Sequence, residues 1–89
     1  MNNIDFTAYY HGDTKKALLY YQKSIRILQE LGHKDAIGTL SNNIGFIYKN
    51  QDDIPKALEF YRFSLKMREE IADPIAIANS LNNIGFIYA

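Results

Sequence analysis

The chain has 89 residues, 47% of them hydrophobic and 22% charged, which is typical of one small globular domain and not of a disordered segment. Equal numbers of basic and acidic residues argue against nucleic acid as a partner, and no apolar run approaches the roughly 20 residues of a membrane-spanning helix. The absence of cysteine excludes disulfides and thiolate metal sites and leaves the compartment open, although we expect the cytoplasm, and the polar start predicts no signal peptide.

One seven-residue segment, Asn-Asn-Ile-Gly-Phe-Ile-Tyr, occurs twice without change, at 42–48 and 82–88. A weaker copy lies 40 residues before the first, at 2–8, where Asp5 replaces the glycine and Ala8 the tyrosine. Identical residues at one constant offset indicate an internal structural repeat. The repeat divides a single domain, residues 1–89, into units of about 2–33, 34–73 and an incomplete 74–89.

The first unit begins with the weak copy, which predicts a short helix of about two turns over residues 2–10. The turn His11-Gly12-Asp13 follows, and the carboxylate of Asp13 is expected to accept a hydrogen bond from the next helix. That helix is predicted from Thr14 to Leu31, ended by Gly32. Its apolar stripe consists of Ala17, Leu18, Tyr21, Ile25 and Leu28.

The second unit predicts two full helices separated by the turn Gln51-Asp52-Asp53. The first of them is expected to begin near Lys34 or Asp35, and the second to be capped by Asp53 and to end near Ile71. Pro55 falls in a first helical turn, where its missing N–H costs little. The residues expected to face inward are Ile37, Leu40, Ile44, Ile47 and Tyr48 in one helix and Ala57, Leu58, Tyr61, Ser64 and Leu65 in the other.

The third unit supplies a single helix, which is predicted to begin at Pro74 with Asp73 as its cap and to run close to the end of the chain. Its inward residues are expected to be Ile77, Leu81, Ile84, Ile87 and Tyr88. No segment shows the alternation of a strand. The predicted fold is therefore all-α, with antiparallel helix hairpins made of four full or near-full helices and a short N-terminal one.

The repeated glycines lie inside predicted helices, where glycine costs about 1 kcal/mol relative to alanine. We expect Gly45 and Gly85 to mark close helix crossings, with Ala57 as the small residue opposite and with Tyr48 and Tyr61 filling the space beside the crossing. Stacked hairpins of this kind bury one continuous core, which is why such units form arrays.

The pattern Ile44-Gly45-x-x-Tyr48, Asp53, Ala57-x-x-x-Tyr61-x-x-Ser64 resembles the tetratricopeptide repeat (TPR) family. The resemblance covers about two and a half repeats and implies an α-solenoid. The common period of the family is 34 residues, whereas this chain has 40. The longer period is similar to that of kinesin light chains, the LGN/Pins polarity adaptors and bacterial TPR regulators.

The resemblance implies a protein or peptide partner, bound on the concave face that the first helices of the units form. It places Asn43, Asn83 and Asn3 at positions where an asparagine can hydrogen-bond a peptide backbone, since an amide both donates and accepts. The residues expected to flank this groove are Asn42, Asn82, Phe46, Phe86 and Lys49. The alternative is that the amides hydrogen-bond within the array itself.

A second function follows from the incomplete units, namely a structural or self-assembling repeat with no ligand. The helix at 74–88 of one molecule could dock on the helix at 14–31 of another, giving a swapped dimer or a head-to-tail oligomer. The residues expected to take part are Ile77, Leu81, Ile84, Ile87, Tyr88, Ala17 and Tyr21. The chain could equally be a fragment of a longer array.

The sequence contains little that indicates metal binding, catalysis or nucleic-acid binding. His11 and His33 are single and fall in loops, so no metal site is expected. No serine has a nucleophile elbow or a paired base, so no catalytic residue, enzyme activity or cofactor is expected. The neighbouring aromatic residues, as at Tyr20-Tyr21, lack the basic stripe that nucleic-acid stacking requires.

Overall fold

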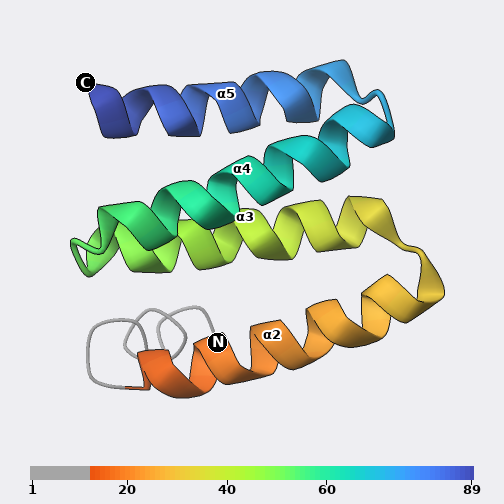
Figure 1. Ribbon diagram of the computed structural model, residues 1–89, viewed down its shortest axis with the longest axis horizontal. Helices are drawn as coiled ribbons and strands as arrows, with labels where there is room; N and C mark the ends of the chain where they lie inside the picture. Colours follow the sequence, from red (N-terminus) through yellow and green to blue (C-terminus); the bar gives the residue numbers. More distant parts are fainter. Residues whose placement is uncertain (1–12) are drawn as a thin grey trace.

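The computed structural model describes residues 13–89, which form helices joined by short turns (Figure 1). The helices are α2 (Thr14–Leu31), α3 (Lys34–Asn50), α4 (Ile54–Glu70) and α5 (Pro74–Tyr88). The predicted all-α class is confirmed, and each predicted boundary in this range agrees within about a residue. The helix predicted over 2–10 lies outside the described residues. None of the four helices is long and apolar enough to cross a membrane.

Successive helices run antiparallel and each packs on the next (Figure 1). The pairing of α3 with α4 is the most extensive, while α2 packs on one side of this hairpin and α5 packs on α4 at the other. The arrangement is that of stacked helix hairpins, in which α3 and α5 are first helices and α2 and α4 are second helices of their units.

The three turns between the helices share one backbone conformation. After α2, Gly32 adopts a left-handed conformation, and the N–H groups of Gly32 and His33 donate to the carbonyls of Gln29 and Leu28. This is the Schellman arrangement that satisfies the last carbonyls of a helix. Asp52 and Ala72 adopt the same left-handed conformation after α3 and α4, with the same two hydrogen bonds. The repeat therefore preserves the turn geometry even where glycine is absent.

Two of the three predicted N-caps form as expected. The carboxylate of Asp53 accepts from the N–H of Lys56, and that of Asp73 accepts from the N–H of Ala76, each at 3.3 Å. The prediction for Asp13 was wrong, because its side chain makes no capping hydrogen bond. The backbone of Asp13 does not adopt the extended conformation of Asp73. Asp13 accepts the first hydrogen bond of α2 only through its backbone carbonyl, from the N–H of Ala17.

The core lies where α3 packs between α2 and α4. Ile37, Ile44 and Ile47 of α3 are buried, as predicted. Met67 of α4 is also buried, although the sequence pattern did not single it out. The buried apolar cluster consists of Leu18, Ile25, Ile37, Ile44, Ile47 and Met67.

The prediction for α5 was wrong at two positions. Leu81 and Tyr88 are exposed, whereas Ile77, Ile84 and Ile87 are half-buried. The reason is that α5 packs on α4 with one side only. The side that carries Leu81 and Tyr88 corresponds to the side of α3 that α4 covers.

Close approach explains Gly45, and Tyr61, which was predicted to fill the space beside the crossing, supplies the nearest atoms. A Cβ atom at Gly45 would lie 2.6 Å from Cδ1 and 2.8 Å from Cε1 of Tyr61, so the tyrosine ring occupies the space that the missing side chain leaves. Tyr61 is itself buried, and burial raises the pKa of its hydroxyl. The expected crossing at Gly85 is absent, since nothing lies within 4 Å of a Cβ there.

Candidate functional site

The exposed side of α3 carries two of the residues expected to line a groove. Asn42 and Phe46 lie one helical turn apart, so their side chains project from the same side of the helix. Phe46 keeps 43% of its surface exposed, which is unusual for a phenylalanine within a packed helix. Asn42 itself is half-buried, whereas both equivalent residues of α5, Asn82 and Phe86, are exposed, Phe86 to 65%. The repeat thus presents two phenylalanines to solvent.

A hydrogen bond joins the two first helices at this side. The Nδ2 of Asn83 donates to the Oδ1 of Asn42 at 2.8 Å, in a half-buried position. The two residues are 41 positions apart, so the second amide of one Asn-Asn pair meets the first amide of the other. The bond brings α3 and α5 together at this point, and the exposed Phe46 and Phe86 each lie about one turn further along their own helix.

The remaining groove candidates lie close to this bond or away from it. Lys49 is half-buried and its Nζ lies 5.6 Å from the centroid of the Phe46 ring, a cation–π contact. Asn43 is half-buried on α3 and lies about 100° around the helix from Asn42. Asn3 lies outside the described residues. The structure therefore brings Asn42 together with Asn83 rather than aligning Asn43 with Asn83.

Arg68 anchors α5 to the rest of the molecule. Its Nη1 donates to the Oγ of Ser80 at 2.8 Å and to the carbonyl of Ala76 at 3.3 Å. Burial lowers the pKa of the guanidinium, and the nearby carboxylate of Asp73 opposes that shift. Within the α3–α4 hairpin, the Oγ of Ser64 donates to the carbonyl of Gly38 at 2.6 Å. Polar side chains thus fix the helix pairs whose first helices form the candidate surface.

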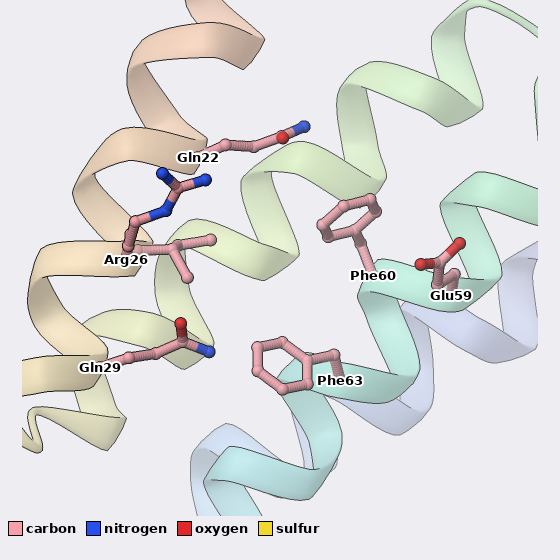
Figure 2. Close-up of a pocket in the computed structure, with 7 residues that line it drawn as sticks. Gln22, Arg26, Gln29, Glu59, Phe60 and Phe63 are labelled. Carbon is pink, nitrogen blue, oxygen red and sulfur yellow. The ribbon is translucent and has the colours of Figure 1, made fainter.

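A cleft of about 460 Å³ opens elsewhere, between the second helices α2 and α4 (Figure 2). Its apolar residues are Ile25, Phe60 and Phe63, and Figure 2 shows the two phenylalanine rings of α4 facing the side chains of α2. The polar lining residues are Gln22, Arg26, Gln29 and Glu59. Sequence reasoning missed this cleft because its walls come from two units, and no local motif marks it.

The residues expected to take part in self-association are divided between two environments. Ile77, Ile84 and Ile87 are half-buried on α5, which packs on α4, and they are therefore partly used within the molecule. Leu81 and Tyr88 remain exposed, although the Tyr88 hydroxyl accepts from the Nη2 of Arg62 at 2.9 Å. Ala17 and Tyr21 are half-buried on α2.

Residues 13–89 contain no group of three or more histidines or carboxylates that could hold a metal ion. Three of the described carboxylates serve structural roles. Asp53 and Asp73 cap helices, and Glu70 forms an ion pair with Lys34 at 2.9 Å.

Comparison with known proteins agrees with this architecture. A family model described as the tetratricopeptide repeat matches residues 39–74, which span most of α3, the turn, all of α4 and the start of α5. No curated protein and no solved structure matches the chain. The α3–α4 hairpin, which contains most of the matched residues, is therefore similar to a tetratricopeptide repeat.

Proposed function

We propose that this chain is a non-catalytic interaction module that binds a peptide or protein segment across the exposed sides of α3 and α5. This surface, here called the Asn–Phe face, consists of Asn42, Phe46, Lys49, Asn82, Asn83 and Phe86. The family resemblance implies that the first helices of the units line a concave face, and the Asn–Phe face lies on two such helices.

The observation that carries the proposal is the hydrogen bond between Asn83 and Asn42, each of which lies about one turn from an exposed phenylalanine of its own helix. The bond between Asn83 and Asn42 uses one donor and one acceptor. An asparagine amide has two donors and an acceptor with two lone pairs, so Nδ2 of Asn42 and Oδ1 of Asn83 retain capacity for a further partner. A peptide backbone offers the complementary N–H and C=O groups at regular spacing.

The two phenylalanines suggest the side chains that such a segment carries. The hydrogen bond between Asn83 and Asn42 brings α3 and α5 close together at this point, and an extended chain advances about 3.3 Å per residue. Apolar side chains about three residues apart in a ligand could therefore reach Phe46 and Phe86 together. Lys49 is the only charged residue of the Asn–Phe face, so the ligand needs few charges of its own.

A random-peptide phage library of about 12 residues, panned against the whole chain, tests this proposal. We expect the enriched peptides to carry two apolar residues about three positions apart. Isothermal titration calorimetry then measures their affinity for the chain. The double substitution Phe46→Ala with Phe86→Ala should weaken binding at least about tenfold, because aromatic anchors dominate such contacts.

The matched control is Phe63→Ala, which removes a phenylalanine from the cleft between α2 and α4 and should leave the affinity unchanged. Circular dichroism of each variant reports whether the helices persist. The proposal fails if no peptide is enriched, or if Phe63→Ala abolishes binding while the double variant retains it, because the cleft would then be the binding site.

A further inference from the structure

Helix α5 exposes an apolar surface that contains no charge. None of the residues from Pro74 to Tyr88 is charged. Ala78, Leu81, Gly85 and Tyr88 recur every three or four positions on one side, and all four are exposed. Leu81 and Tyr88 each expose more than half of their surface. These four residues are here called the α5 face.

Helix α2 exposes a second uncharged surface. At 100° per residue, positions 20, 24, 27 and 31 fall within a narrow arc of the helix. They are occupied by Tyr20, Ser24, Ile27 and Leu31, all exposed, and the three large side chains expose more than half of their surface. The charged residues of α2 lie at other positions. These four residues are here called the α2 face.

The two faces correspond, at the repeat offset of 40, to the two surfaces that pack together in the α3–α4 hairpin. Ala78, Gly85 and Tyr88 stand at the positions of Gly38, Gly45 and Tyr48, and Tyr20, Ser24 and Ile27 stand at the positions of Phe60, Ser64 and Met67. In the hairpin these surfaces are in contact. Met67 lies 3.6 Å from a Cβ built at Gly38, Ser64 donates to the Gly38 carbonyl, and the rings of Tyr48 and Phe60 stack with centroids 5.7 Å apart.

We propose that α5 of one copy of this chain packs on α2 of a second copy, in the arrangement that α3 and α4 adopt within one copy. Ile27 then lies beside Ala78, the Ser24 hydroxyl donates to the Ala78 carbonyl, and the ring of Tyr20 stacks on that of Tyr88. Leu81 stands where α3 has Ser41, so the contact buries a leucine and α2 lies further from α5 at this point than α4 does from α3.

The contact joins two different surfaces, so two copies held by one such contact keep one α2 face and one α5 face unused. Such heterologous contacts give a ring or a growing head-to-tail assembly. Zero formal net charge means that little repulsion opposes the association. The α2 face and the α5 face do not include Asn42, Phe46 or Lys49. The test of this proposal is therefore independent of whether the Asn–Phe face binds a peptide.

Sedimentation velocity and light scattering of the whole 89-residue chain, between roughly 10 and 300 micromolar, test the assembly. We expect the mean mass to rise with concentration above the 10.3 kDa of one chain. A mass that stays at that of one chain over the whole range overturns the proposal.

Single substitutions locate the contact. Ile27→Glu and Leu81→Glu each place a charge on one face and should weaken association at least about tenfold. The matched controls are Leu19→Glu and Ile75→Glu, which introduce the same charge at exposed apolar positions of the same two helices but off the faces. The exposed Glu59 and Asp35 stand at the equivalent positions of α4 and α3, so these controls should associate as the parent chain does.

Mixing the two face variants is the sharpest test. Ile27→Glu keeps an intact α5 face and Leu81→Glu an intact α2 face, so the mixture should form a one-to-one dimer that grows no further. Gly85→Leu, whose side chain enters open space in the isolated chain, provides a second α5-face variant should Leu81→Glu lose helicity. Failure of the mixture to pair overturns the proposal, as does association that only the off-face controls abolish.

Discussion

The same seven residues, Asn-Asn-Ile-Gly-Phe-Ile-Tyr, end both α3 and α5, but the two copies have different surroundings. In α3, Ile44 is 0% exposed and Gly45 is buried against the ring of Tyr61. In α5, Ile84 is half-buried, Gly85 faces open space and Tyr88 is 67% exposed. Local sequence is identical, so the difference comes from the neighbouring helices.

The comparison separates what the seven-residue segment encodes from what the neighbouring helices supply. Both copies form helix, and both place an isoleucine toward the preceding second helix. Only α3 also has a second helix of its own unit, α4, packed on its other side. In α3 the glycine therefore permits close packing of the neighbouring helix. In α5 it lowers the stability of the helix, as a glycine inside a helix does, and no close contact compensates for this loss.

The largest expected difference concerns the paired isoleucines. Ile44→Ala should lower the free energy of unfolding by about 3–4 kcal/mol, because it opens a cavity in a fully enclosed site. Ile84→Ala should cost about 1 kcal/mol, because its site is already partly open to solvent. Urea unfolding followed by circular dichroism measures both. Equal losses would show that α5 is as enclosed in solution as α3.

The paired glycines should respond with opposite signs. Gly45→Ala places a Cβ 2.6 Å from a ring that cannot move freely, and we expect a loss of about 2 kcal/mol. Gly85→Ala meets no atom within 4 Å and should raise stability by up to about 1 kcal/mol through helix propensity. Thermal and urea unfolding of the two single variants provide the measurement. Stabilisation by both would contradict the close approach of Tyr61.

Arg68 is expected to hold α5 more than it holds the hairpin. Arg68→Met keeps the aliphatic stem but removes the hydrogen bonds to Ser80 and Ala76, leaving the buried Ser80 hydroxyl without this donor. We expect a loss of about 1–2 kcal/mol. Amide hydrogen exchange should quicken in α5 while the α3–α4 core keeps its protection. Uniform loss of protection would instead indicate that Arg68 stabilises the whole array.

The smallest expected effect concerns an ion pair that α5 lacks. Lys34 at the start of α3 pairs with Glu70, but Pro74 stands at the equivalent position of α5. The hydrogen bond from Lys34 lowers the pKa of Glu70, although slight desolvation opposes the shift. Because the folded pKa lies below the unfolded value, the contribution is fully present above the unfolded pKa and is lost as pH falls through the folded one.

An NMR titration of the Glu70 carboxyl, repeated in Lys34→Gln, checks this assignment. The midpoint should move upward in the variant, toward the ordinary value of a glutamate. Stability should change little, because exposed ion pairs contribute weakly. An unchanged midpoint would show that the pair does not persist in solution.

The sequence predicted most of the fold because its signals are local. Asp73-Pro74 starts α5, Gly32 ends α2, and the spacing of isoleucines identifies the buried side of α3. The candidate surface was predicted only in part. The position of Phe46 and Phe86 follows from the repeat, but the bond from Asn83 to Asn42 depends on the separation and rotation of two helices, which no local pattern specifies.

The sequence by itself determined the helices, their turns and the 40-residue repeat, because capping, left-handed turn residues and helical periodicity act between residues close in the chain. Only the tertiary structure decided that Gly85 lacks the close contact that Gly45 makes with Tyr61, that Leu81 and Tyr88 face outward, and that two asparagines hydrogen-bond to each other. The physical reason is that burial and side-chain pairing belong to the contact between helices, so identical residues differ wherever their neighbours differ.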